Sequence, residues 1–210
     1  MTDSTFFGGI KVASARLTLS EPQEINRLAD GSILKASLGA ALWRGQLSLI
    51  PGYHPDQGAI EAKLARLTRA GQTFLAYDTR YDGPAADPEG IILGTNAPTI
   101  HALDADNRRM RVAGLPSGYR LSTGDWIGWT YGSNPVRYAL HRIETDAVAT
   151  SSGITPLFAV EPFIRPGVTV AAPVNLIRPP MKAILTESDY GSARPLITDG
   201  ASFSFIQTLR

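Results

Sequence analysis

The chain contains no cysteine among its 210 residues. This absence excludes disulfides, thiolate metal sites and cysteine nucleophiles, and it fits a protein made in a reducing cytoplasm. An excess of one charge is also lacking, because Lys+Arg 20 against Asp+Glu 19 leaves a formal net charge of +1. Because positive and negative charges are nearly equal in number, the chain as a whole is not attracted to nucleic acid or to anionic lipid. We therefore expect no specific nucleic-acid binding.

Long hydrophobic runs are missing as well. No stretch approaches the roughly 18 apolar residues that a membrane helix needs. Residues 1–9 lack a basic region followed by an apolar run, which is the pattern of a secretory signal. The sequence predicts a soluble intracellular product without a membrane segment.

The sequence motifs typical of catalytic sites are absent too. The sequence holds no Gly-x-Ser-x-Gly elbow, Walker A loop, His-Glu-x-x-His pair or strand-followed Gly-x-Gly-x-x-Gly. His54, His101 and His141 lie far apart; we interpret His54 as a turn residue beside Pro55, and the other two as surface or strand positions. We predict no enzyme activity, no catalytic residue and no cofactor.

Two acidic segments raise the question of a metal site. Asp78 to Gly90 carries four acids, but the spacing differs from an EF-hand and Arg80 would repel a cation at the third loop position. Asp104 to Asn107 has the composition of a turn. We predict a solvated loop and a turn, and no bound metal.

What the sequence does contain is β-structure signals. Gly 20 and Pro 15 are spread along the chain, as expected when turns join many short strands. Trp43, Leu47 and Leu49 fall on one face of a predicted strand and Arg44, Gln46 and Ser48 on the other. Further strands are predicted at 33–38, 74–77, 109–113, 125–131, 138–144, 157–162, 168–177, 181–186 and 201–207.

One helix is expected over 57–70. Ile60, Leu64 and Leu67 recur at helical spacing, Asp56 can cap the start, and Gly71 can end the helix. The predicted fold is mainly β: a β-barrel or sandwich with one packed helix and an inserted smaller β-module. We place an irregular N-terminal arm at 1–29, the discontinuous barrel core at 30–87 and 151–210, and the inserted module at 88–150.

Three large aromatic side chains lie close together at Trp126, Trp129 and Tyr131. On a strand, Trp129 and Tyr131 share a face and Trp126 points to the other, so a continuous platform for sugars is not implied. Packing in a core or an interface is the main interpretation. Carbohydrate binding stays open as the alternative.

The order of several segments resembles tail proteins of long-tailed, siphovirus-like phages and prophages of alphaproteobacteria. The segments cover roughly residues 27 to 185 and are turn-and-strand motifs rather than chemical signatures: Arg27–Ile33, Gly39–Gly45, Glu61–Leu67, Phe74–Asp78, Gly114–Tyr119, Leu121–Trp126, Leu140–Arg142 and Val160–Pro162.

The resemblance implies a distal-tail or baseplate component. Such a protein would act as a virion structural protein, forming a ring, expected to be a hexamer, that joins the tail tube to the tail hub and fibres. The expected location is the virion tail, after assembly in the host cytoplasm. The alternative is a carbohydrate- or receptor-binding module at the tail tip.

Overall fold

The computed structural model describes residues 2–210. Its fold is mainly β, and α1 (His54–Leu67) is the one α-helix in that range. This confirms the predicted mainly-β class with one packed helix. The chain divides into two compact units, each discontinuous in sequence. Unit 1 holds residues up to 9, 73–183 and 209–210, and unit 2 holds 10–72 and 184–208.

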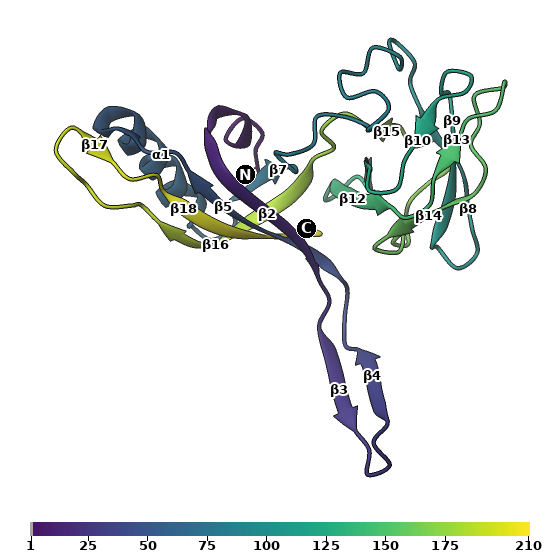
Figure 1. Ribbon diagram of the computed structural model, residues 1–210, viewed down its shortest axis with the longest axis horizontal. Helices are drawn as coiled ribbons and strands as arrows, with labels where there is room; N and C mark the ends of the chain where they lie inside the picture. Colours follow the sequence, from purple (N-terminus) through teal and green to yellow (C-terminus); the bar gives the residue numbers. More distant parts are fainter. Residues whose placement is uncertain (1) are drawn as a thin grey trace. The chain divides into compact units, whose positions relative to one another are not determined.

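Unit 1 contains a nearly closed β-barrel sheet (Figure 1). Its strands follow the order β15-β11-β12-β14-β9-β8. The two end strands approach each other because Ile100 N–H donates to Ala172 O at 3.0 Å and Ala171 N–H donates to Ile100 O at 2.8 Å. The bounds are β8 (Thr99–Leu103), β9 (Arg109–Ala113), β11 (Trp126–Tyr131), β12 (Arg137–Ile143), β14 (Phe158–Glu161) and β15 (Val174–Asn175).

Alternating side chains of these strands fill the barrel. Ile127, Trp129 and Tyr131 of β11 point inward, as do Met110 and Val112 of β9. A short pair outside the barrel sheet joins β10 (Arg120–Leu121) to β13 (Ala147–Val148). The barrel therefore lies within residues 99–175, whereas the sequence analysis placed it in residues 30–87 and 151–210. The reason is the hydrogen bonding between Ile100 and residues 171–172, which sequence periodicity does not reveal.

The first residues of the chain belong to unit 1 and are ordered. β1 (Thr2–Asp3) pairs in parallel with β7 (Thr73–Ala76), and the 3-10 helix η1 spans Phe7–Gly9. Phe6 and Phe7 are buried, with ring centroids 5.5 and 6.2 Å from that of Phe74. Because this aromatic cluster holds the segment, residues 2–9 are not the irregular arm that the sequence analysis expected.

Unit 2 is built on an open sheet with the order β16-β18-β5-β2. β16 continues into it from unit 1, where its first residues pair with β7. Leu17 and Leu19 on β2 alternate with Arg16 and Thr18, in register with β5. The bounds are β2 (Val12–Ser20), β3 (Gln23–Arg27), β4 (Ile33–Ser37), β5 (Leu42–Leu49), β6 (Gly52–Tyr53), β16 (Met181–Asp189), β17 (Ile197–Thr198) and β18 (Ser202–Gln207).

The core of unit 2 follows the predicted alternation of β5. Trp43, Leu47 and Leu49 are buried, and Phe203 and Phe205 of β18 are buried beside them in the register of the pairing. The space above Gly45 is taken by the Phe205 ring, since a Cβ at Gly45 would lie 2.0 Å from Phe205 Cζ. A larger residue at position 45 would displace this ring.

The helix α1 begins and ends three residues earlier than expected. Tyr53 is its N-cap residue and makes no side-chain capping bond, so Asp56 lies in the first turn rather than at the cap. Pro55 fits there because the first helical turn needs no amide hydrogen bond. Leu64 and Leu67 are buried as predicted, and Ile60 is half-buried. The helix contacts β6 and β17.

The unit boundaries differ in position from the expected domains. They fall at 72/73 and 183/184, whereas the sequence analysis drew the inserted module at 88–150. The loop at 78–90 is part of unit 1, because its carboxylates are bonded to that unit. Residues 10–29, the rest of the expected arm, form β2, β3 and the turn after them.

Candidate assembly surface

The most exposed element of the chain is the β-hairpin formed by β3 and β4. It continues the β2 and β5 strands and projects away from the sheet of unit 2 (Figure 1). Every residue from 21 to 39 is exposed. The predicted turn at Asp30-Gly31 forms its tip: Gly31 has φ 84°, and Asp30 Oδ1 accepts hydrogen bonds from Ser32 N at 2.9 Å and Ser32 Oγ at 2.7 Å.

The two faces of this hairpin differ in chemistry. On one face, Asn26 lies opposite Leu34 and Glu24 lies opposite Ala36. Leu38 extends this face, because its N–H donates a hydrogen bond to Pro22 O at 2.8 Å. Ile25 lies opposite Lys35 and Arg27 opposite Ile33 on the other face. We call the first face, defined by Leu28, Leu34, Ala36 and Leu38, the leucine face. It carries one charged side chain, that of Glu24, among the paired residues of the two strands.

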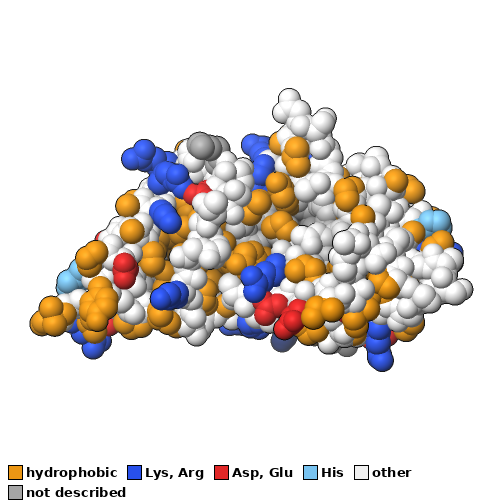
Figure 2. All heavy atoms as spheres, turned by 90° about the horizontal axis from the view of Figure 1, so that it is seen from above, with side chains coloured by type: hydrophobic (Ala, Val, Ile, Leu, Met, Phe, Trp, Pro, Cys, Tyr) orange, Lys and Arg blue, Asp and Glu red, His pale blue; other side chains and the backbone are white. Residues whose placement is uncertain are grey.

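A second exposed apolar surface lies around β6 and β17. Tyr53 is paired with Ile197, and Leu196 precedes it; their exposed fractions are 69%, 37% and 79%. We call these three residues the turn patch. Figure 2 shows hydrophobic side chains gathered at the left edge of the view, the side on which Figure 1 draws β17.

The outward face of the unit 2 sheet is polar and hollowed. A groove of about 390 Å³ lies over β2, β5, β18 and the second half of β16. Arg16, Arg44 and Glu187 line it together with hydroxyl side chains and Gln46, and Phe205 and Ile206 add apolar surface. The charged side chains on this face favour contact with water or with a polar partner.

The aromatic strand does not provide an exposed platform. Trp126, Trp129 and Tyr131 are all buried. Trp129 stacks on His141 with ring centroids 4.5 Å apart, and Arg142 lies 4.6 Å above the Trp126 ring. The predicted division of the three rings between the two faces of the strand is confirmed, since Trp129 and Tyr131 belong to the barrel core and Trp126 lies on the other face.

The structure does not bring the three histidines together. His54 is the first residue of α1, not a turn residue, and its Nδ1 lies 2.7 Å from Thr198 Oγ1. His101 is exposed on β8.

His141 is buried, with Nδ1 2.6 Å from Pro162 O. Desolvation is the main cause that lowers the pKa of His141 to about 4. The charge of Arg165 also lowers this pKa, whereas the hydrogen bond to Pro162 raises it. The neutral ring thus donates Nδ1–H to that carbonyl.

The acidic segment from Asp78 to Gly90 is anchored rather than solvated. Asp78 and Asp87 are buried, and Asp82 and Glu89 are exposed. Asp87 accepts hydrogen bonds from the backbone N–H of Ile92 at 3.1 Å and Leu93 at 2.8 Å, and from Tyr119 OH at 3.2 Å. Burial would raise the pKa of Asp87, but these bonds outweigh it and the pKa is lowered. The expectation of a solvated loop is corrected for these two residues.

Arg80, expected to repel a cation, pairs with Asp78. Arg80 Nη2 lies 2.8 Å from Asp78 Oδ2, and Arg80 Nε donates to Asp78 Oδ1 at 2.9 Å. Burial opposes ionisation of Asp78, yet the bonds from Arg80 and the side chain of Trp126 leave its pKa lowered. The carboxylate therefore fixes its own loop against β11.

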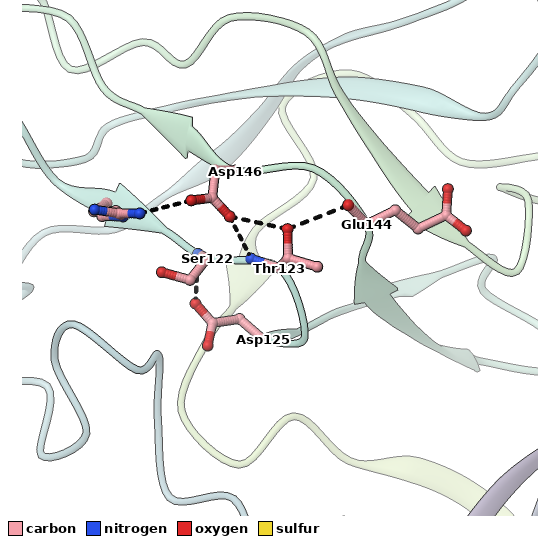
Figure 3. Close-up of polar contacts among 6 residues, drawn as sticks. Ser122, Thr123, Asp125, Glu144 and Asp146 are labelled. Carbon is pink, nitrogen blue, oxygen red and sulfur yellow. Dashed lines mark hydrogen bonds and ion pairs between the residues drawn. The ribbon is translucent and has the colours of Figure 1, made fainter.

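A second carboxylate network joins the turn before β11 to the segment after β12 (Figure 3). Asp146 accepts bonds from Thr123 N at 2.8 Å and Arg120 Nη2 at 2.6 Å. These donors lower the pKa of Asp146 to about 2. Asp125 is buried and accepts from Ser122 N at 2.7 Å and Ala85 N at 2.8 Å, but desolvation raises its pKa.

These carboxylates bind backbone amides, which is the pattern of loop anchoring. Within residues 2–210 no group of three or more His, Asp or Glu side chains is placed to hold a metal ion. Nor does that part of the chain include a helix long and apolar enough to cross a membrane. Asp104 lies in the turn expected before β9 and pairs with Arg109.

No protein-family model matches this sequence, and no curated protein is significantly similar to it.

Sequence reasoning did not identify the leucine face or the turn patch. The signal for the first was present, because Leu28, Leu34 and Leu38 flank a strong turn at Asp30-Gly31. For the second the sequence holds only scattered apolar residues, and the pairing of β6 with β17 brings them together across more than a hundred residues.

Proposed function

We propose that this chain is a structural protein of a phage tail that forms a ring, most simply a hexamer, at the distal tail or baseplate. It joins the tail tube to the tail hub and fibres, and its place is the virion tail after assembly in the host cytoplasm. The protein acts by binding copies of itself and its neighbours, without enzyme activity.

The observation that carries the proposal is the β3–β4 hairpin. All its residues are exposed, and Ile25, Ile33, Leu34 and Leu38 are 60%, 60%, 56% and 65% exposed. An isolated two-stranded hairpin is at best marginally stable in water, and exposed apolar surface of this kind marks interaction sites. An extended element that its own chain leaves uncovered suits a protein whose work is assembly.

Two further features support assembly into a ring. β2 is an edge strand of nine residues, Val12–Ser20, without proline, and such an edge presents unpaired backbone groups to another chain. The formal net charge of +1 limits repulsion between copies. The polar groove face with Arg16, Arg44 and Glu187 suits a wet channel wall.

The carbohydrate-binding alternative receives no support from the aromatic strand. A sugar site of the expected kind needs exposed ring faces, and the rings of Trp126, Trp129 and Tyr131 are buried. We therefore keep the assembly role as the proposal.

Negative-stain microscopy and mass photometry of the purified full chain test the proposal. The expected result at high protein concentration is a closed particle with a central hole, since a heterologous contact closes when its rotation divides a full turn. The resemblance to tail components implies a mass of about six chains. A chain that remains monomeric at every concentration and binds glycans in that state would contradict it.

A further inference from the structure

Strand β2 forms the open edge of the unit 2 sheet, because it is the last strand in the sheet order. We infer that this edge binds an extended segment of a partner protein as an added antiparallel strand, and that the side chains of the bound segment alternate between acidic and apolar residues. The inference goes beyond the proposed ring, because the bound segment belongs to a different protein.

The hydrogen bonds of β5 show which of its residues face β2. Leu49 N–H donates to Ala201 O at 2.8 Å, on the side of β18, whereas Ile50 N–H donates to Lys11 O at 3.1 Å, on the side of β2. Successive residues of a strand direct their backbone groups to opposite sides. The odd-numbered residues of β5 therefore bond to β18, and the even-numbered residues bond to β2.

The same register leaves alternate backbone groups of β2 free. Arg16 and Thr18 lie opposite even-numbered residues of β5, so their N–H and C=O groups bond to that strand. Ala15, Leu17 and Leu19 direct theirs to the open edge, and no hydrogen bond to another segment within residues 2–210 involves these groups. An extended peptide can pair with this row of groups and so add a strand to the sheet.

The side chains of β2 predict the alternation of the bound segment. Arg16 and Thr18 line the groove, while Leu17 and Leu19 are half-buried on the face that carries the core. An added strand continues both faces, so its residues beside Leu17 and Leu19 are best apolar. Opposite Arg16 the pair is of the kind without hydrogen bonds between its two residues, in which the side chains lie closest.

Charge on the groove face favours an acid at the position opposite Arg16. Residues 11–20 include Lys11 and Arg16 and no acid. Arg44 lies diagonally across from Arg16 on β5, and within residues 2–210 neither arginine forms an ion pair. Glu187 also lines the groove, but it belongs to β16, three strands from β2 or roughly 14 Å at the usual strand spacing. A carboxylate on the added strand would thus meet a cation that has no acid beside it.

The same charges disfavour a second copy of β2 as the added strand. Two copies of β2 bring only cations to the contact, and like charges opposite each other destabilise a strand pair. The partner strand therefore needs acids that β2 lacks.

Two short synthetic peptides test the inference on the purified full chain. One alternates glutamate with valine, and the matched control alternates lysine with valine. We expect the glutamate peptide to bind at least tenfold more tightly in fluorescence anisotropy. Equal affinities, or no binding of either peptide, would overturn the inference.

Amide hydrogen exchange locates the bound peptide. The amides of Ala15, Leu17 and Leu19 should gain protection with the glutamate peptide, while those of Arg16 and Thr18, which β5 already holds, should change little. Protection confined to other segments would contradict the site. Protection of the same three amides on raising the chain concentration without peptide would assign the edge to a second copy, and it would overturn the inference as well.

A charge reversal separates binding from folding. Arg16→Glu changes an exposed side chain, so it should leave the melting temperature nearly unchanged, weaken binding of the glutamate peptide at least tenfold and make the lysine peptide the tighter ligand. Lys63→Glu makes the same charge change at an exposed position of α1 and should keep the original preference. An Arg16→Glu chain that still prefers the glutamate peptide would refute the role of Arg16.

Ring formation is not part of any of these readouts. A chain that forms rings and does not bind the glutamate peptide would remove this inference and leave the proposed function. A chain that binds the peptide at β2 and never forms rings would do the reverse.

Discussion

Buried polar side chains of unit 1 act through backbone partners. Asp87, Asp125 and His141 each bond to amides or carbonyls of other segments, so they stabilise loops at the cost of desolvation. These hydrogen bonds account for the burial of the three side chains without invoking a catalytic role. The sequence does not predict the bond from Tyr119 to Asp87, because Tyr119 lies 32 residues away.

Replacing Asp87 by Asn should destabilise unit 1. The amide retains one acceptor oxygen and places an N–H₂ group near the N–H donors of Ile92 and Leu93. A loss of about 1–3 kcal/mol is expected for an unsatisfied buried group. Urea unfolding measures it, with hydrogen exchange of residues 92 and 93 as the local readout. Glu89→Gln, at an exposed position, is the control, and equal effects of the two changes would refute this role.

His141 should make stability depend on pH between about 6.5 and about 4. The pKa is lowered from 6.5 to about 4 by burial, so its contribution is complete above pH 6.5 and is lost as the pH falls towards the folded value. The size of that loss is about 2–4 kcal/mol.

His141→Gln should therefore flatten the stability profile in that window, whatever its effect at pH 7. Urea unfolding at several pH values measures the slope. His101→Gln, at an exposed position, should keep the original slope. An unchanged slope in the His141 variant would show that the ring is not buried in its neutral form.

At the scale of elements, the sequence predicts best where one side of a strand is buried. The alternation of Trp43, Leu47 and Leu49 identified β5, and the spacing of Leu64 and Leu67 identified α1 within three residues at each end. Confirmed strands also include β9, β11, β12, β14, β16 and β18.

Other elements had weaker signals. β2 was missed although Leu17 and Leu19 alternate with Arg16 and Thr18, because its apolar face is only half-buried at the sheet edge. β3 has no apolar periodicity, and all five of its residues are exposed, so no buried face could mark it in the sequence. Barrel closure depends on the meeting of β8 with residues 171–174, which no local pattern encodes.

Leu64→Asp should prevent unit 2 from folding. Leu64 has no exposed surface, so the carboxylate would be desolvated without a partner. The smaller change Leu64→Ala should cost about 2–5 kcal/mol. Circular dichroism and thermal melting check both. Ala65→Asp, on the exposed side of α1, should melt close to the natural chain, and a folded Leu64→Asp protein with an unchanged melting temperature would disprove the placement of this face.

For the whole molecule, we propose a role in assembly. Its buried carboxylates fix loops, its aromatic strand fills a barrel, and a projecting hairpin and a strained turn are among the places where it exposes apolar residues. On this proposal, the functional parts of the molecule are surfaces that a second chain would cover.

A cryo-EM reconstruction of the intact tail that carries this chain is the decisive test of the proposed ring. We predict a closed ring of six copies around the tail axis, between the tube and the hub, with each hairpin in contact with a neighbouring copy. Single copies at fibre tips, or any position off the tail axis, would contradict the account.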